Sequence, residues 1–418
     1  MRSVEFKSSS ARRPADRKAQ IAAAASALFR ERGFHGVSVA DIAAVVGITA
    51  PAVYKHFHSK HELLGYAVRD ALDVLGSLSQ DARDIDGLLQ QLAAYHFERR
   101  GLGALWQREV RHLPAEQREA LRRRFLSIAE RCAVLIQAAR PVPPADAELL
   151  ARAVLGVFGS LSWHRITLPR RRFEDLVCRL TAAVAYCQLG DPVWEPSLPD
   201  GSGAIGARLT VPRREQLLTE AIRLFDERGF HSVTTDDIGA AAGVSGPSIY
   251  RHYPAKTDLL VAAVERGSQR RQASSAHALA RADEPHEALK LLLRAYIDFA
   301  LDNSHLLGVL ISELDHLPEQ RRKHNLQMER DFLALWGQLL DQAAPGSDRA
   351  EQKVVIQAVL TVVDNVARSR RLAARADIAD RLAEIGNAVL LGRWDADPRQ
   401  AELLAGPTPV VKDKVNLQ

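Results

Sequence analysis

Two short clusters of polar side chains carry the clearest chemical potential in this 418-residue chain. Each cluster has a tyrosine, a basic residue and a histidine in succession, and a lysine four residues further on. The members are Tyr54, Lys55, His56 and Lys60 in the first cluster and Tyr250, Arg251, His252 and Lys256 in the second. All of these side chains carry N–H or O–H donors, which suit the phosphate oxygens of a nucleic acid. The clusters therefore predict a phosphate-contacting surface that occurs twice.

Short side chains precede both clusters, and basic ones lie further upstream. The short residues are Thr49, Ala50 and Ala52 in one case and Ser245, Gly246 and Ser248 in the other. At the start of a helix they would let the backbone approach base edges. The basic residues are Arg12, Arg13, Arg17 and Lys18, and then Arg208, Arg213 and Arg214. They are expected to form a basic arm before the first helix of each head.

An internal repeat organises these features. Residues 17–66 and 213–262 align without a gap at an offset of 196 and share 21 identities in 50 positions. The parts that follow match more loosely, for example Glu109 and His112 with Glu313 and His316 at an offset of 204. Two tandem units are therefore predicted, each with a retained head and a diverged body. The predicted divisions are 1–62 and 208–258 for the heads, 63–190 and 259–395 for the bodies, 191–207 for a linker and 396–418 for a tail.

Each head has the pattern of three short helices. Apolar residues between Ile21 and Phe29 recur at helical spacing, and Gly33 stands where a helix end needs a left-handed residue. Ser38 and Asp41 predict a capping box, and Gly47 predicts the turn before a third helix at about residues 50–57. The second head repeats these features with Gly229, Thr234, Asp237 and Gly243 and a third helix near residues 246–253. This arrangement is a helix-turn-helix.

Residues 48–60 and 244–256, which contain the two polar clusters, resemble the signature of the TetR/AcrR family of regulators. The resemblance implies an all-α fold, with a three-helix DNA-binding head and a helical body that binds a small molecule and dimerises. It also implies repression that is relieved by the ligand. Family members often carry a basic residue just before the Asp-Ile pair of the second helix, where this chain has Ala40 and Asp236. The residues predicted to contact DNA are Arg17, Lys18, Ser38, Thr49, Ala50, Ala52, Tyr54, Lys55, His56, Lys60, Arg213, Arg214, Thr234, Thr235, Ser245, Gly246, Ser248, Tyr250, Arg251, His252 and Lys256.

Charge is divided unevenly between the heads. Residues 1–66 hold ten Lys/Arg and five Asp/Glu, whereas residues 208–262 hold seven of each. A neutral head releases fewer counterions from DNA. The first head is therefore expected to contribute more affinity, so that replacing Lys55 and Lys60 costs more binding than replacing Arg251 and Lys256.

The bodies are helical throughout and rich in large apolar residues. Their spacing fits core positions as well as it fits a pocket, because both use the same residue types. The family resemblance, rather than the periodicity, implies a cavity. The residues predicted to line it are Phe97, Leu105, Trp106, Phe125, Phe158 and Trp163 in the first body and Phe299, Leu310, Phe332 and Trp336 in the second.

Other chemistries find little support in the sequence. The Glu-x-x-His pairs at 109–112 and 313–316 lead directly into Leu-Pro, which indicates solvated or capping charges at a helix end rather than metal ligands. Cys132, Cys178 and Cys187 lack the spacing of a zinc site or a disulfide framework. They are expected to be small core residues, because free cysteine tends to be buried. Phosphate loops and nucleophile elbows are missing, so no cofactor is expected and an enzyme or ligand carrier is only the alternative class.

Composition sets broad limits. Apolar residues make up 47% of the chain, and the net charge of +5 permits nucleic-acid binding without establishing it. The N-terminus has no pattern of a signal peptide, and apolar runs of about ten residues are too short to span a bilayer. A cytoplasmic protein with no membrane partner is expected.

The fusion leaves two arrangements open. One chain can supply both heads as an internal pseudo-dimer, or two chains can form a homodimer with four heads. The third helices differ at 49/245, 50/246, 52/248 and 55/251, so the expected double-stranded operator is an imperfect palindrome with unlike half-sites. A small-molecule effector is the other expected partner, and one of the two bodies can have lost ligand binding and kept only dimerisation.

Overall fold

The computed structural model describes residues 14–99, 101–163, 168–190, 212–244, 246–346 and 348–392. All regular elements in these ranges are helices, which confirms the all-α prediction. None of the helices in these ranges has the length and apolar character needed to cross a membrane. The predicted linker, the predicted tail and residues Arg12, Arg13, Arg208 and Ser245 lie outside the described ranges.

The helices follow the same order in both units. The first unit consists of α1 (Pro14–Arg32), α2 (Val39–Val46), α3 (Ala50–Tyr54), α4 (Lys60–Asp81), α5 (Ile85–Glu98), α6 (Leu102–Ala104), the π-helical turn η1 (Leu105–Glu109), the 3₁₀ turn η2 (Val110–His112), α7 (Ala115–Ala139), α8 (Pro144–Ser160) and α9 (Arg170–Ala185). The second consists of α10 (Arg213–Arg228), η4 (Phe230–Ser232), α11 (Thr235–Ala241), α12 (Gly246–Ile249), α13 (Lys256–Leu279), α14 (Pro285–Asp302), α15 (Ser304–Ser312), η5 (Leu314–His316), α16 (Glu319–Ala343), α17 (Arg349–Ala367), α18 (Arg370–Ala373) and α19 (Ile378–Leu391).

The helix ends in both heads form as the sequence predicts. The Ser38 hydroxyl accepts the Asp41 amide at 3.1 Å, and the Asp41 carboxylate accepts the Ser38 amide at 2.8 Å. Thr234 and Asp237 make the same two bonds in the second head. The hydrogen bonds from the capping residue hold the pKa of each aspartate below its usual value. Gly47 has a φ of 73°, a left-handed conformation that glycine adopts without steric cost.

Several predicted helix boundaries are wrong. The third helices end at Tyr54 and Ile249, several residues earlier than predicted, because the chain turns to bury the aromatic residues Phe57 and Tyr253. The predicted basic arms are wrong as well. Helix α1 begins at Pro14 and α10 begins at Arg213, so Arg17, Lys18, Arg213 and Arg214 lie inside the first helices and not before them.

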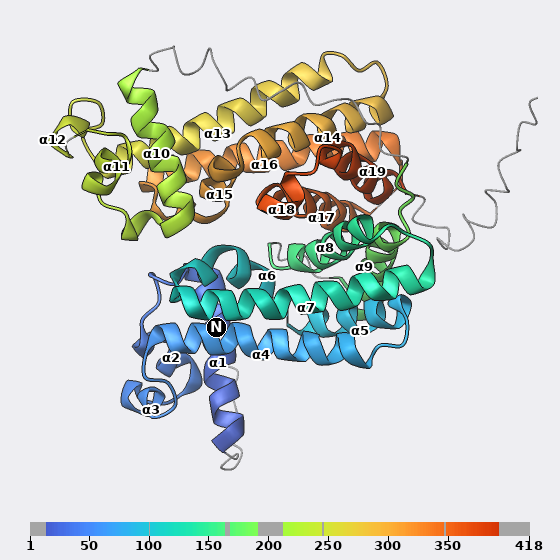
Figure 1. The fold of residues 1–418 in the computed structure, drawn as a ribbon, viewed down its shortest axis with the longest axis horizontal. Coiled ribbons are helices and arrows are strands. Elements are labelled where there is room, and N and C mark those ends of the chain that lie inside the picture. The colour runs from blue at the N-terminus through green and yellow to red at the C-terminus, as the bar shows by residue number, and fades with distance from the viewer. Residues whose placement is uncertain are drawn as a thin grey trace, which may run out of the picture.

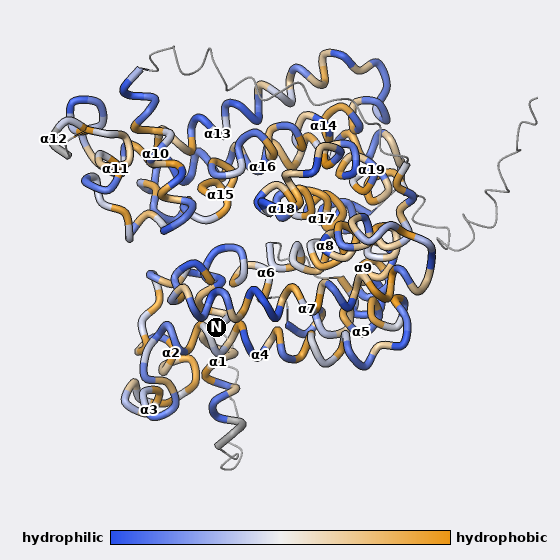
Figure 2. The backbone as a smooth tube through the Cα atoms, in the orientation of Figure 1, coloured by the Kyte–Doolittle hydropathy of each residue, from blue (hydrophilic) through white to orange (hydrophobic). Residues whose placement is uncertain are grey.

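The two bodies pack face to face within the one chain. Helix α8 lies against α17 and α9 lies against α19, while both heads lie on the same side of the molecule (Figure 1). Both central helices are mostly buried, at twelve of 17 residues in α8 and twelve of 19 in α17. Figure 2 shows the hydrophobic character of these segments. A helix that is apolar on nearly all sides is stable only when other elements cover it, and here each unit covers the other.

Ion pairs surround this apolar contact at the end away from the heads. Arg375 contacts Asp146 at 2.6 Å, and Arg172 contacts Glu351 at 2.6 Å and Asp348 at 2.9 Å. Each pair joins the first unit to the second. Within the one chain, the two units are thus paired as an internal pseudo-dimer.

We expect Gly156→Leu to disrupt the contact between the bodies. A Cβ atom at Gly156 would lie 3.1 Å from Val362 of α17, so a larger side chain overpacks the interface. Such overpacking costs about 1–3 kcal/mol, which thermal unfolding would detect as a lower melting temperature. The matched control is Gly76→Leu in α4, where a Cβ meets no atom within 4 Å. Equal melting temperatures for the two variants would contradict the packing of α8 on α17.

Candidate nucleic-acid interface

The end of the third helix and the turn that follows it present equivalent side chains to solvent in both heads. Tyr54 is 49% exposed and Tyr250 is 54% exposed, which is unusual for large aromatic residues. Lys55 and Arg251, which follow them directly, are exposed as well. Exposed donors of this kind at equivalent places are available to phosphate oxygens.

Short residues lie at the start of both helices. Thr49 is the N-cap residue of α3, as predicted, but its side chain makes no capping hydrogen bond. Its exposed hydroxyl is therefore available to an external partner. In the second head, the Thr235 hydroxyl lies 3.2 Å from that of Tyr250 and orients it at the helix surface.

Lys60 and Lys256 require a correction. The Lys60 ammonium donates to the backbone carbonyls of Phe34 at 2.7 Å and Val37 at 2.9 Å, and lies 4.2 Å from the centre of the Phe34 ring. Lys256 donates in the same way to Phe230 and Val233, each at 2.8 Å. Partial burial lowers the pKa of both lysines. These lysines fasten the turn after the first helix, and we remove them from the proposed phosphate contacts.

The basic residues of the first helices are also partly engaged inside the heads. The Lys18 ammonium lies 5.0 Å from the ring centre of Phe57, and the Arg214 guanidinium lies 4.7 Å from that of Tyr253. Arg213 donates to the carbonyl of Ala242 at 3.0 Å. These cations stabilise the packing of the first helix on the third-helix turn.

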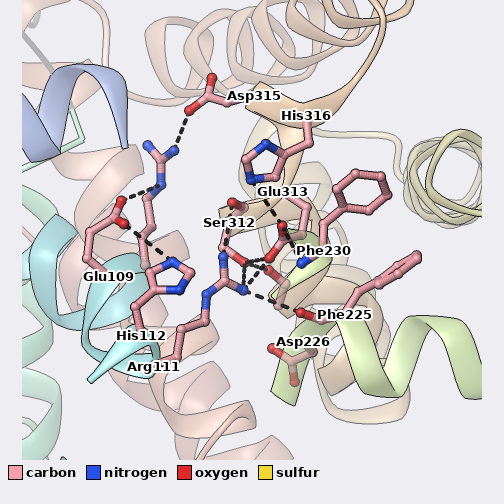
Figure 3. Close-up of polar contacts among 12 residues, drawn as sticks. Glu109, Arg111, His112, Phe225, Asp226, Phe230, Ser312, Glu313, Asp315 and His316 are labelled. Carbon is pink, nitrogen blue, oxygen red and sulfur yellow. Dashed lines mark hydrogen bonds and ion pairs between the residues drawn. The ribbon is translucent and has the colours of Figure 1, made fainter. Parts of the chain in front are cut away.

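A buried carboxylate from each body holds each head. The Glu109 side chain, at the end of η1, accepts the backbone amide of Phe34 at 2.9 Å, directly after the Gly33 turn. Glu313 accepts the amide of Phe230 at 3.2 Å in the second unit. Burial raises the pKa of both glutamates, and the arginines and the accepted amides oppose this shift. Figure 3 shows the two carboxylates at the junction of the heads and bodies.

A histidine stacks beside each of these carboxylates. The ring of His112 lies 5.3 Å from that of Phe34, and His316 lies 5.6 Å from Phe230. Burial lowers the pKa of His112 to about 3 and that of His316 to about 4, so both are neutral near pH 7. The sequence interpretation of these glutamates as solvated or helix-capping charges is therefore wrong: both are buried, make no side-chain cap of their own helices, and bind the heads. Their recurrence at an offset of 204 is the signal that marked them. No cluster of three or more His, Cys, Asp or Glu residues suited to a metal occurs among the described residues.

The first body contains a cavity of about 120 Å³. Three of the predicted residues, Trp106, Phe125 and Phe158, line it. The sequence did not indicate its polar residues, which are His96, Gln107, Arg152 and Asn365. Gln107 donates to the Asn365 carbonyl across the contact between the units. Because Asn365 belongs to the second unit, only the pairing of the bodies completes this cavity.

The other predicted pocket residues have different surroundings. Phe97 packs on Phe173 at 5.5 Å, and Leu105 is buried beside α1. Trp163 is half-buried at the end of a described segment and does not line the cavity.

The equivalent interior of the second body is filled. At an offset of 204, Ile128 and Cys132 of α7 correspond to the larger Phe332 and Trp336 of α16, and Trp336 is fully buried. Phe332 and Trp336 pack on each other and on Tyr296, whose hydroxyl donates to Asp364 at 2.6 Å. Two further predicted pocket residues lie elsewhere: Phe299 lines a groove between α13 and α14, and Leu310 packs against Gly267.

Two of the three cysteines lie in the core as predicted, whereas Cys178 is half-buried. Cys132 and Cys187 are buried, all three thiols are free, and burial raises the pKa of Cys132 and Cys187 to about 12.

We expect Lys60→Met to lower stability and not only DNA affinity. The substitution leaves the carbonyls of Phe34 and Val37 without their charged donor, at a cost of about 1–3 kcal/mol. Thermal unfolding measures the effect, with Lys55→Met as the control on an exposed lysine of the same head. If both variants have the same melting temperature as the unsubstituted protein, the assignment of a structural role to Lys60 is contradicted.

Comparison with known proteins covers both heads and one body. Residues 21–67 and 217–263 match the bacterial regulatory proteins of the tetR family. Residues 282–368 match the tetracyclin repressor-like C-terminal domain. These matches agree with the repeat and with the helical order described above.

Curated relatives resemble parts of the chain. The HTH-type transcriptional activator FasR of Mycolicibacterium smegmatis is 33% identical over 122 residues, which cover 29% of this chain and 55% of FasR. The HTH-type transcriptional repressor KstR2 of Rhodococcus jostii is 31% identical over 110 residues, which cover 24% of this chain and 54% of KstR2. The chain thus spans about half the length of these relatives in each match.

Two solved structures each resemble less than half of the chain. A TetR-family transcriptional regulator from Bordetella parapertussis 12822 is 20% identical, with a TM-score of 0.41, and the match covers 44% of this chain and 97% of that one. The ketosteroid regulator KstR2 of Mycobacterium tuberculosis, also 20% identical, has a TM-score of 0.40 and coverages of 44% and 96%.

Two copies of the DNA-binding domain, each attached to a helical body in one polypeptide, show that the chain belongs to the TetR family of bacterial transcriptional regulators and carries two of its units in tandem.

Proposed function

We propose that a single chain occupies one operator with both of its heads and acts as a complete DNA-binding dimer. The observation that carries this proposal is the pairing of α8 with α17 while both heads lie on one side of the molecule (Figure 1). Dimeric helix-turn-helix proteins place two recognition helices in successive major grooves, about 34 Å apart. Here the second recognition helix comes from the same polypeptide.

The two heads are proposed to bind unlike half-sites. The backbone-directed donors are retained, because Tyr54 and His56 recur as Tyr250 and His252. The short residues that would approach base edges differ, as in the exchange of Ala52 for Ser248. Phosphate contacts position a protein on DNA and base contacts specify the sequence, so the preferred operator is an imperfect palindrome.

The effector is proposed to occupy the cavity in the first body. An engineered apolar cavity of about 150 Å³ binds benzene, so 120 Å³ corresponds to a ligand of about one ring. The amide of Gln107 and the neutral ring of His96, whose pKa burial lowers to about 4, give this cavity a polar edge. An apolar or amphipathic small molecule fits such a site. Since Phe332 and Trp336 fill the equivalent position in the second body, we propose one ligand of this kind per chain.

The π-helical turn η1 provides a path from the cavity to the first head. Trp106 and Gln107 line the cavity, and Glu109, two residues later in the same turn, holds the amide of Phe34. Single-turn π-helical segments are rare in proteins and occur frequently at functional sites. A ligand that displaces Trp106 would therefore reposition Glu109 and the head bound to it.

The direction of regulation is proposed to be repression relieved by the ligand. When a ligand reorients one head, that head no longer fits its half-site. The chain then loses the affinity gained from binding DNA with two linked heads at once, even though each head alone still binds. The relatives include both an activator and a repressor. A promoter fusion to the chain's operator distinguishes the two: expression rises when the regulator is deleted if it represses, and falls if it activates.

Substitution of the exposed basic residue next to the third helix of each head tests DNA binding. Lys55→Ala is expected to weaken operator binding several-fold and to reduce the slope of log affinity against log salt by about 1, as loss of one phosphate contact does. Arg251→Ala is expected to have a smaller effect, because its head is less basic. Fluorescence anisotropy over a range of salt concentrations measures both.

Lys323→Ala serves as the control, since Lys323 is exposed on α16, away from the heads, and pairs with Glu319 of the same helix. Equal losses for Lys55→Ala and Arg251→Ala would contradict the unequal heads. A loss as large for Lys323→Ala would contradict the assignment of the third helices as the DNA contact.

Filling the cavity tests the ligand site. A Cβ at Gly159 meets no atom within 4 Å, so Gly159→Leu is expected to occupy the cavity without distorting α8. With benzyl alcohol as a one-ring probe, calorimetry should give one saturable site per chain and none for Gly159→Leu. Gly337→Leu in α16, which also has open space around its Cβ, should leave that site intact. Two equivalent sites per chain would contradict the proposal.

A further inference from the structure

A cluster of charged residues joins the two units next to the heads. Arg108 contacts the Asp315 carboxylate at 2.5 Å, and Arg111 donates to the Ser312 hydroxyl at 2.8 Å. Arg111 also forms an ion pair with Glu313, the carboxylate that holds the second head. The side chains of both arginines are less than one fifth exposed. Figure 3 shows Arg111 directed from the first unit toward Ser312 and Glu313 of the second.

These contacts follow the internal repeat. At the offset of 204, Arg108 corresponds to Ser312 and Arg111 corresponds to Asp315. Arg108, at the first position of one unit, contacts Asp315, at the second position of the other. Arg111 and Ser312 make the equivalent contact with the units exchanged. This is the reciprocal pattern of a two-fold interface. The glutamate between the two positions is the same in both units, as Glu109 and Glu313.

The two positions have diverged in opposite directions. The first unit has arginine at both, and the second unit has serine and aspartate. If two first units paired in this geometry, four arginines would meet with only two glutamates between them. If two second units paired, two glutamates and two aspartates would meet with no arginine from these positions. Like charges forced together across an interface oppose association, so only the mixed pair brings opposite charges together.

The ion pairs at the other end of the interface do not discriminate in this way. There Asp146 of the first unit meets Arg375 of the second, and Glu351 of the second meets Arg172 of the first. Each unit supplies an acid at the start of one helix and an arginine near the start of the next. Like units would retain opposite charges at this end, so the discrimination lies next to the heads.

We propose that Arg108, Arg111, Ser312 and Asp315 form a pairing-specificity surface that directs the first unit to pair with the second. The surface opposes pairing between like units of different chains, so that the two unlike heads stay together. It also connects the two glutamates that hold the heads. Arg111 follows Glu109 by two residues in the first unit, and it forms an ion pair with Glu313 of the second. The inference concerns the pairing of the units and is independent of DNA binding.

The test exchanges the chemistry of the two sides in the full chain. Ser312→Arg with Asp315→Arg gives both units the first pattern, and Arg108→Ser with Arg111→Asp gives both the second. Each double variant is expected to lower the melting temperature by several degrees and to increase the radius of gyration in small-angle scattering, because the units separate. All four substitutions together exchange the pattern and are expected to restore both quantities toward those of the unsubstituted chain.

A charge-matched control places Arg at Ser77 and Asp331, which are exposed on α4 and α16. It is expected to leave both quantities unchanged. Unchanged double variants, or a fourfold variant as impaired as the doubles, would overturn the proposal, since complementary charge would then not determine pairing. If a double variant fails to fold by circular dichroism, recovery of folding in the fourfold variant supports the proposal and its absence overturns it.

Discussion

The apolar faces of α8 and α17 are shielded from water because they pack on each other. The positions of the other parts of the molecule depend on this contact. Both helices are buried over most of their length. The pairing fixes the two bodies, and the bodies fix the heads through Glu109 and Glu313. It also completes the cavity of the first body, to which Asn365 contributes from the second unit. A chain that separated its units would lose the cavity wall and the common orientation of the heads together.

The two units share the hydrogen bonds that hold their heads but differ in the packing of their interiors. The turn after the first helix is fastened identically in both heads, by Lys60 or Lys256 and by a glutamate from the body. The interiors differ because Trp336 replaces Cys132 at an equivalent position and fills the space. The cavity of the first body therefore has no counterpart at the equivalent position in the second. The charges next to the heads diverged as well, and in complementary directions.

Local signals made much of the fold predictable. The capping pairs Ser38–Asp41 and Thr234–Asp237 and the glycine turns depend on residues close in sequence, so their pattern is visible without a structure. The roles of Lys60 and Lys256 could not be predicted from the sequence. A lysine in a polar cluster gives the same sequence pattern whether it binds phosphate or a backbone carbonyl 26 residues away. The cavity could be placed in a body but not delimited. Its polar wall joins Gln107 to Asn365, 258 residues apart, and only tertiary packing brings such residues together.

The central claim is that one chain forms the complete DNA-binding unit. Native mass spectrometry of the full chain bound to its operator tests this most directly, because it counts chains per DNA duplex. The account predicts one 46.0 kDa chain per operator with two half-sites, and a mass that does not increase when more protein is added. A stable complex that contains two chains on that duplex, with one chain failing to bind both half-sites, would contradict it.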